Sequence, residues 1–230
     1  MGANIEFASN GDTDAGYLVL PAGGSGPGVV VIQEWWGLDS GTKDVADRLG
    51  REGFVALAPD LYRGVLVGHT EMDKAAQMMT SLPPERAARD MSGAVDYLAN
   101  HEAVTGDGIG IIGFCMGGML SFLLATGRPD KVKAVLAFYG FPQGDSEPDW
   151  SKLQAPVRGH MAENDDFFGP DAARALESKL QGMGKDVQFT IHPGTGHAFM
   201  ATHNALGTRD EALAETIWPE ATSFLHTQLG

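Results

Sequence analysis

Short apolar runs alternate with amphipathic segments along the whole chain. The runs are rich in β-branched residues and too short to be core helices, so we interpret them as buried strands. The strands expected from them span residues 17–20, 28–32, 54–58, 109–114, 132–139, 156–161 and 187–191. Between these strands, apolar residues recur at helical spacing over residues 42–52, 71–81, 84–100, 117–125, 171–180 and 211–229. This alternation predicts the α/β class, with a mostly parallel sheet flanked by helices.

The chain carries no sign of a division into separate parts. No linker rich in proline and serine, no internal repeat and no low-complexity tract interrupts the alternation, so we expect a single domain over residues 1–230. A glycine-rich stretch at residues 22–27 lacks the Gly-Lys-Ser/Thr ending of a phosphate-binding loop and precedes a strand. We interpret this stretch as a hairpin turn.

Charge and composition exclude several classes of function. Lys and Arg total 16 against 30 for Asp and Glu, and the formal net charge of −14 opposes nucleic-acid binding. No apolar stretch reaches the roughly 18 residues of a membrane span, and the first residues lack the pattern of a secretory signal. The single cysteine, Cys115, can form no intramolecular disulfide and suits a reducing compartment. We therefore expect a cytoplasmic protein, and the oligomeric state stays open between a monomer and a small homo-oligomer.

The residues around Cys115 indicate catalysis. Gly113-Phe114-Cys115-Met116-Gly117 joins an expected strand directly to an expected helix, which is the nucleophile-elbow pattern with cysteine in the position of serine. The two glycines let strand and helix approach closely around a strained turn. At the helix N-terminus the dipole favours a thiolate, and the Met116 N–H is aimed at a developing oxyanion. A lone cysteine is more often a packing residue, but the flanking glycines favour a nucleophile.

A base and an acid follow the cysteine in the order that this pattern requires. His197 lies in the loop after the last expected strand, where the general base belongs. Asp165 and Asp166 both follow the strand that ends near residue 161; we favour Asp165 as the acid that orients His197, and Asp166 stays open. His192 and His203 lie nearby in the sequence, but neither the spacing nor the completing ligands of a zinc site accompany them. We expect no metal and no cofactor.

The loop after the strand at residues 28–32 supplies further candidates. Glu34 stands beside two indoles, and the N–H of Trp35 is expected to complete the oxyanion hole with Met116. The alternative for Glu34 is an ordinary loop salt bridge. The expected wall of the substrate pocket is apolar and aromatic. It comprises Trp36, Phe138, Tyr139, Phe141, Phe167 and Phe199.

Together these residues resemble the dienelactone hydrolase (carboxymethylenebutenolidase) family. The similar segments are residues 33–37, 59–62, 113–118 and 138–140, the loop around Asp165, and residues 196–199, in family order over most of the chain. The resemblance implies an α/β-hydrolase fold with a triad of Cys115, His197 and Asp165 that hydrolyses a small ester or lactone. It also implies that Glu34 contacts the resting thiol and moves when substrate binds, which would protect the cysteine from stray oxidation.

The sequence departs from the family where the family binds charge. Family members hold the carboxylate of the lactone with arginines, and one of these lies four residues after the triad histidine, where this chain has Ala201. Another precedes the long helix, where residues 71–79 contain no arginine and Arg63 is a candidate substitute. A tyrosine of the family's pocket is Phe138 here. Because a buried carboxylate without a cation is costly, we expect neutral apolar esters to be preferred over dienelactone.

Two other functions stay open at this point. An activated phosphotriester can react at the same sulfur, which would make the chain a promiscuous phosphotriester hydrolase. The other alternative is a thiol sensor or a non-catalytic interaction scaffold, although a sensor usually keeps a resolving cysteine and this chain has only Cys115.

Overall fold

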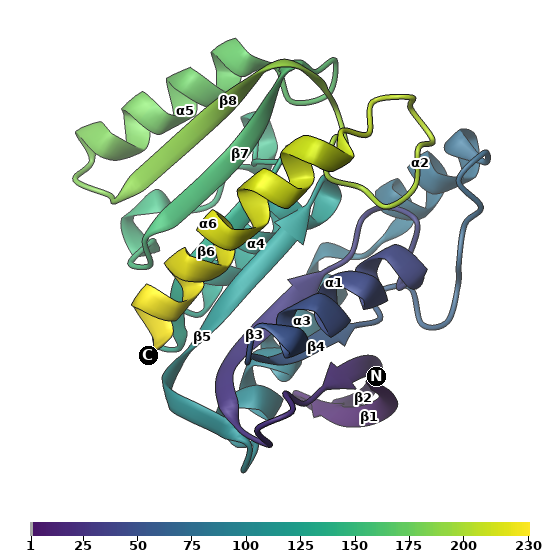
Figure 1. Ribbon diagram of the computed structural model, residues 1–230, viewed down its shortest axis with the longest axis vertical. Helices are drawn as coiled ribbons and strands as arrows, with labels where there is room; N and C mark the ends of the chain where they lie inside the picture. The colour runs from purple at the N-terminus through teal and green to yellow at the C-terminus, as the bar shows by residue number, and fades with distance from the viewer. Residues whose placement is uncertain (1) are drawn as a thin grey trace.

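The computed structural model describes residues 2–230 and contains one sheet with helices on both faces (Figure 1). The eight strands lie in the order β1-β2-β4-β3-β5-β6-β7-β8. They are β1 (Ala3–Ser9), β2 (Asp12–Val19), β3 (Gly26–Ile32), β4 (Val55–Pro59), β5 (Val104–Phe114), β6 (Val132–Phe138), β7 (Val157–Asn164) and β8 (Val187–Gly196). The pairs β1/β2 and β2/β4 are antiparallel and all other neighbours are parallel, which confirms the expected sheet.

The helices cover the sheet in two layers. They are α1 (Ser40–Arg51), α2 (Met72–Ser81), α3 (Pro84–Ala99), α4 (Met116–Gly127), α5 (Pro170–Gly182) and α6 (Glu211–Leu229), with short 3₁₀ turns η1 (Gly144–Ser146) and η2 (Trp150–Lys152). α1 and α6 pack on one face of the sheet, toward the viewer in Figure 1, and α3, α4 and α5 pack on the other. Within residues 2–230, no helix is long and apolar enough to cross a membrane.

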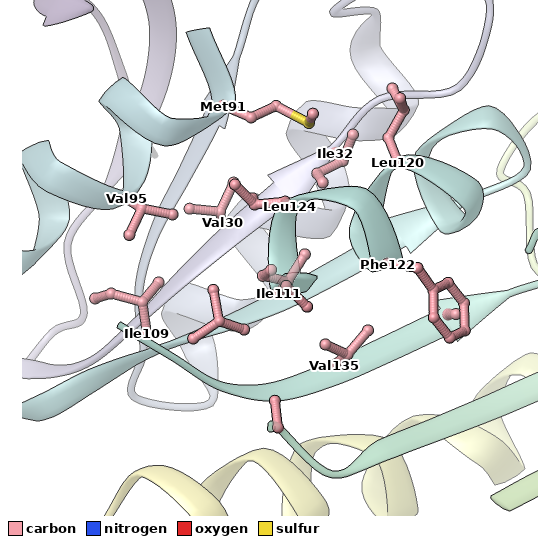
Figure 2. Close-up of a cluster of buried hydrophobic side chains, with 14 of the residues drawn as sticks. Val30, Ile32, Met91, Val95, Ile109, Ile111, Leu120, Phe122, Leu124 and Val135 are labelled. Atoms are coloured by element: carbon pink, nitrogen blue, oxygen red, sulfur yellow. The ribbon is translucent and has the colours of Figure 1, made fainter. Parts of the chain in front are cut away.

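The central strands are buried on both faces, which explains their continuous apolar runs. Successive side chains of a strand point to opposite faces, so Val30 contributes to the core beneath α3 and α4 while Val29 contributes to the core beneath α1 and α6. Figure 2 shows the first of these cores, to which Ile111 of β5, Met91 of α3 and Leu124 of α4 all belong. This packing fixes the positions of the strand ends that carry the candidate site.

The N-terminal hairpin differs from the sequence expectation. β1 was not predicted, and its turn is Asn10-Gly11, where both residues have positive φ (43° and 99°), as a two-residue turn of type I′ requires. The stretch at residues 22–27 is not a hairpin turn, because β4 lies between β2 and β3 in the sheet. That prediction was wrong because the short loop joins strands that are consecutive in sequence but not paired.

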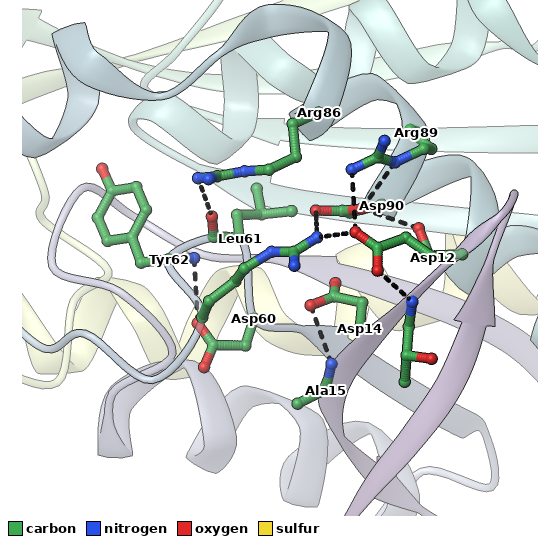
Figure 3. Close-up of polar contacts among 12 residues, drawn as sticks. Asp12, Asp14, Ala15, Asp60, Leu61, Tyr62, Arg86, Arg89 and Asp90 are labelled. Atoms are coloured by element: carbon green, nitrogen blue, oxygen red, sulfur yellow. Dashed lines mark hydrogen bonds and ion pairs between the residues drawn. The ribbon is translucent and has the colours of Figure 1, made fainter.

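A network of aspartates and arginines holds the turn after β4 (Figure 3). Asp60 accepts the Tyr62 backbone N–H at 3.1 Å. The φ of Arg63 is 52°, and its guanidinium lies 3.6 Å from a carboxylate oxygen of the buried Asp90. The Tyr62 hydroxyl in turn donates to the sulfur of Met116 at 3.5 Å. Through Tyr62, the network therefore contacts the side chain of Met116, the first residue of α4.

Candidate active site

The candidate catalytic residues follow the carboxyl ends of parallel strands. Glu34 comes after β3, Cys115 directly after β5, Asp165 directly after β7 and His197 directly after β8. Parallel strands place these ends at one edge of the sheet, which is where open α/β sheets bind their ligands. Residues far apart in the sequence are thereby brought to one place.

The elbow at Cys115 depends on close contacts that only glycine permits. Cys115 has φ 54° and ψ −119°, an unfavourable conformation for a side-chain-bearing residue that costs on the order of 1–3 kcal/mol. A Cβ on Gly113 would lie 2.1 Å from the Gly117 carbonyl oxygen, and one on Gly117 would lie 2.3 Å from that of Ile32. A Cβ on Gly140 would lie 1.9 Å from the Cys115 carbonyl oxygen. The turn is therefore enclosed by backbone on several sides.

The environment of Cys115 strongly favours the protonated thiol over the thiolate. Its residue is 8% exposed, and burial raises the pKa of the thiol well above its ordinary value. The negative charge of Glu34, and to a smaller extent that of Asp165, raises this pKa further, while the Met116 backbone N–H lowers it. The N–H at the start of α4 thus favours the thiolate, as expected from the helix N-terminus, but burial and the two carboxylates outweigh this effect in the resting state.

His197 and Asp165 form a buried pair. His197 Nδ1 lies 2.8 Å from Asp165 Oδ2, with side chains 7% and 0% exposed. The other oxygen of Asp165 accepts the backbone N–H groups of Phe167 and Phe168 at 2.8 and 2.9 Å. Burial alone would raise the pKa of Asp165, but the hydrogen bond and charge of His197 lower it below its ordinary value. Asp166 is exposed, so the acid that contacts the histidine is Asp165.

Glu34 is paired with His203, a histidine considered from the sequence only as a zinc ligand and set aside. Glu34 Oε2 lies 2.9 Å from Nε2 of His203, with side chains 13% and 9% exposed. Within residues 2–230, no hydrogen-bond partner is present for Glu34 Oε1 or for the buried Tyr139 hydroxyl. No group of three or more His, Cys, Asp or Glu side chains in that range is placed to hold a metal ion. The two partners are 169 residues apart, so no local pattern announces the pair.

Only part of the expected aromatic wall lies at the surface of the site. Phe167 is 49% exposed, with its ring centroid 4.8 Å from that of His197 and 6.1 Å from that of Trp35. Tyr139 lines a cavity that Glu34 and His203 also line. The other expected wall residues are buried: the phenylalanines belong to the cores between sheet and helices, and the indole packs with Val67 and Ala75 beside α2. They are Trp36, Phe138, Phe141 and Phe199.

Comparison with known proteins identifies a family. Residues 15–229 match the family model described as the dienelactone hydrolase family. The chain is 34% identical over 235 residues to protein usf of Aquifex pyrophilus, and 33% identical over 235 residues to an Aquifex aeolicus protein provisionally named carboxymethylenebutenolidase; each alignment covers 100% of both chains. A dienelactone hydrolase-like promiscuous phosphotriesterase from metagenomic libraries superposes with a TM-score of 0.84 at 23% identity, covering 100% of this chain and 99% of that chain. The chain belongs to the dienelactone hydrolase family, has the α/β-hydrolase fold and is a hydrolase of ester bonds.

Proposed function

We propose that this chain hydrolyses small, neutral, apolar esters or lactones through a triad of Cys115, His197 and Asp165. The observation that carries the proposal is the buried 2.8 Å contact between His197 and Asp165 at the same sheet edge as the strained cysteine elbow. Tyr139 and the residue before it link the His197–Asp165 pair to the Cys115 elbow. Its ring centroid lies 5.1 Å from that of His197, and the carbonyl of the preceding Phe138 accepts the Cys115 N–H at 3.0 Å.

The geometry supports covalent catalysis in two steps. Because Asp165 engages Nδ1 of His197, Nε2 is the nitrogen free to take the proton of Cys115. The thiolate attacks the carbonyl carbon, and the backbone N–H groups of Trp35 and Met116 stabilise the oxyanion. His197 then protonates the departing alkoxide and leaves an acyl thioester. Water, deprotonated by the same nitrogen, adds to the thioester carbonyl. The C–S bond of the resulting tetrahedral intermediate then breaks, which releases the acid, and His197 returns its proton to the sulfur.

The surroundings of the site favour uncharged substrates. Position 201, where family members have an arginine, is Ala201, and it lines the same cavity as Glu34. Arg63, the candidate substitute, is held by Asp12 at 2.9 Å in the network behind α4. Exposed apolar surface is supplied by Phe167 beside the triad histidine. A substrate carboxylate would therefore meet a carboxylate of the protein and aromatic rings, an arrangement that penalises it.

A phosphotriester is the second candidate substrate. The observation that favours it is the similarity of the whole chain to the dienelactone hydrolase-like promiscuous phosphotriesterase, whose fold it shares. The same sulfur would displace the leaving group at phosphorus instead of carbon, with the same histidine returning a proton. Phosphotriesters are neutral, so the absence of a carboxylate-binding arginine does not oppose them.

The test compares three enzymes on three substrates. Initial rates of wild type, Cys115→Ala and Ala201→Arg are measured on a neutral aryl ester, a dienelactone and an aryl phosphotriester. We expect Cys115→Ala to abolish hydrolysis of every substrate that wild type accepts, and Ala201→Arg to raise the preference for dienelactone over the aryl ester. Retained activity of Cys115→Ala would refute the nucleophile. A wild-type preference for dienelactone would refute the assignment of neutral substrates.

Trapping of the intermediate separates hydrolysis from thiol sensing. Wild type mixed briefly with an activated ester should show, by mass spectrometry, an acyl group on Cys115 that disappears with product release. A chain that only sensed oxidants would instead gain oxygen at Cys115 with peroxide and turn over no ester. Membership of a hydrolase family supports the first outcome.

A further inference from the structure

Two histidines and two carboxylates connect the N-terminus of α1 to the loop that carries Glu34. His203 Nε2 lies 2.9 Å from Glu34 Oε2, and the ring centroid of His203 lies 4.2 Å from that of His69. His69 Nε2 in turn lies 2.9 Å from Asp39 Oδ2. Asp39 caps α1 by accepting the Thr42 N–H at 2.9 Å on its other oxygen. The ring of His203 is thus held between Glu34 and His69, which Asp39 in turn connects to the N-terminus of α1.

A buried indole keeps this arrangement largely out of water. Trp36 is 2% exposed, and its ring centroid lies 5.1 Å from that of His69 and 5.8 Å from that of His203. The side chain of His203 is 9% exposed and that of Glu34 is 13% exposed. Charges withdrawn from water in this way act on their neighbours more strongly than surface charges do.

We propose that His203 is a positioning residue for Glu34. Its imidazolium holds the carboxylate, compensates the negative charge and so sets how readily Cys115 gives up its proton. The inference rests on the proposed function, in which Cys115 is the nucleophile. Among the residues that the structure describes, no lysine or arginine lines the cavity that Glu34 faces, and the side chain that contacts Glu34 there is His203.

The titratable groups that face His203 come from three loops. They are Glu34 after β3, Asp39 before α1, His69 before α2 and, across the shared cavity, Tyr139 after β6. Burial alone would lower the pKa of His203, but the hydrogen bond and charge of Glu34, with a contribution from Asp39, raise it above its ordinary value. Burial and the charge of Glu34 raise the pKa of the Tyr139 hydroxyl well above its ordinary value. Tyr139 therefore adds no charge near neutral pH.

The alkylation of Cys115 by iodoacetamide measures the proposed effect directly. Cys115 is the single cysteine of the chain, so the rate reports one thiolate without any substrate. We expect His203→Gln to slow alkylation about tenfold near pH 7, because loss of the cation should raise the pKa of the thiol further. His203→Lys supplies a permanent positive charge and should restore most of the rate. Toward alkaline pH, where His203 loses its proton, the wild-type profile should fall below that of His203→Lys and approach that of His203→Gln.

A double-mutant cycle tests whether His203 acts through Glu34. In a Glu34→Gln background, His203→Gln should change the alkylation rate by less than about twofold, because there is no carboxylate left to compensate. His101→Gln is the matched control, since His101 lies before β5 and contacts the Ala103 N–H, away from this loop cluster. Thermal unfolding of each variant checks that it is folded. Should His203→Gln not fold, His69→Gln removes the ring that holds His203 and should slow alkylation in the same direction.

The outcomes distinguish this inference from the proposed function. Coincident alkylation profiles for wild type, His203→Gln and His203→Lys would overturn the role of His203, whatever the hydrolytic activity. An equal effect of His203→Gln in the presence and absence of Glu34 would also overturn it. Failure of the proposed function shows elsewhere, as ester hydrolysis that survives Cys115→Ala.

Discussion

Replacement of Asp14 by asparagine should stabilise the protein at neutral and alkaline pH. Asp14 lies on β2 in the network of Figure 3 and is 3% exposed. One of its oxygens accepts the Ala15 N–H at 2.9 Å, while the other has no hydrogen-bond partner within residues 2–230. Burial, and then the charge of nearby Asp90, raise the pKa of Asp14 from 3.8 to about 7. The folded protein thus holds a proton that the unfolded chain releases.

The size and sign of the effect follow from this difference in pKa. Since the folded pKa is the higher one, the contribution of Asp14 to stability is full below pH 3.8 and is lost as the pH rises through about 7. The loss is about 1.5 kcal/mol at about pH 5 and about 4 kcal/mol at about pH 8. Asparagine keeps the oxygen that accepts from Ala15 and stays neutral, so Asp14→Asn should recover most of the loss at either pH.

Urea unfolding of wild type and Asp14→Asn at both pH values measures the effect. The gain in the free energy of unfolding should be larger near pH 8 than near pH 5 by about 2–3 kcal/mol. Asp12→Asn is the control, because the hydrogen bond from Arg63 lowers the pKa of the exposed Asp12 and its neutralisation should bring no gain near pH 8. A gain for Asp14→Asn that is the same at both pH values would refute the reasoning, as would no gain near pH 8.

Two further predictions concern the site itself. Asp165→Asn should lower kcat about 10³- to 10⁴-fold, since it leaves His197 without the acceptor that fixes its tautomer, whereas Asp166→Asn should change kcat by less than about threefold. Ester hydrolysis at saturating substrate measures both, and equal losses would contradict the pairing. Gly140→Ala should inactivate or unfold the protein, because its Cβ would lie 1.9 Å from the carbonyl oxygen of Cys115. Gly127→Ala is the control: its Cβ would have no atom within 4 Å, so it should be neutral or stabilising by up to about 1 kcal/mol. Thermal unfolding and the activity of the two variants test this prediction. An active and stable Gly140→Ala would count against the close contact.

The central strands could be predicted because their sequence signal is strong and local. Val29 and Val30 belong to a run that is apolar at every position, as expected for a strand covered on both faces. β1 gives no such run, because it is an edge strand and, of its apolar side chains, Phe7 is the one that is buried. Its hairpin signal, Asn10-Gly11, is present in the sequence but lies between the polar residues Ser9 and Asp12 and not between alternating apolar ones, which weakens the signal.

The site was predictable only where its residues belong to local motifs. The glycines around Cys115 and the position of His197 after the last strand are visible in one sequence. Whether an aromatic ring at a strand end faces solvent or core depends on the helices packed against it, which is why Phe138 proved to be buried. The contact between Glu34 and His203 joins residues 169 apart and has no signature short of the folded chain.

The charge around Cys115 explains why a cysteine suits this site. Burial and the carboxylates of Glu34 and Asp165 raise the pKa of the thiol more than the Met116 N–H lowers it, so the resting enzyme holds the protonated form, which oxidants attack slowly. Hydrolysis by the proposed mechanism nevertheless needs the thiolate. Of the groups that raise the pKa of the thiol, burial contributes most and the charge of Glu34 comes next, and Glu34 is paired with His203. In the proposed mechanism the reactivity of Cys115 therefore depends on that partner of Glu34.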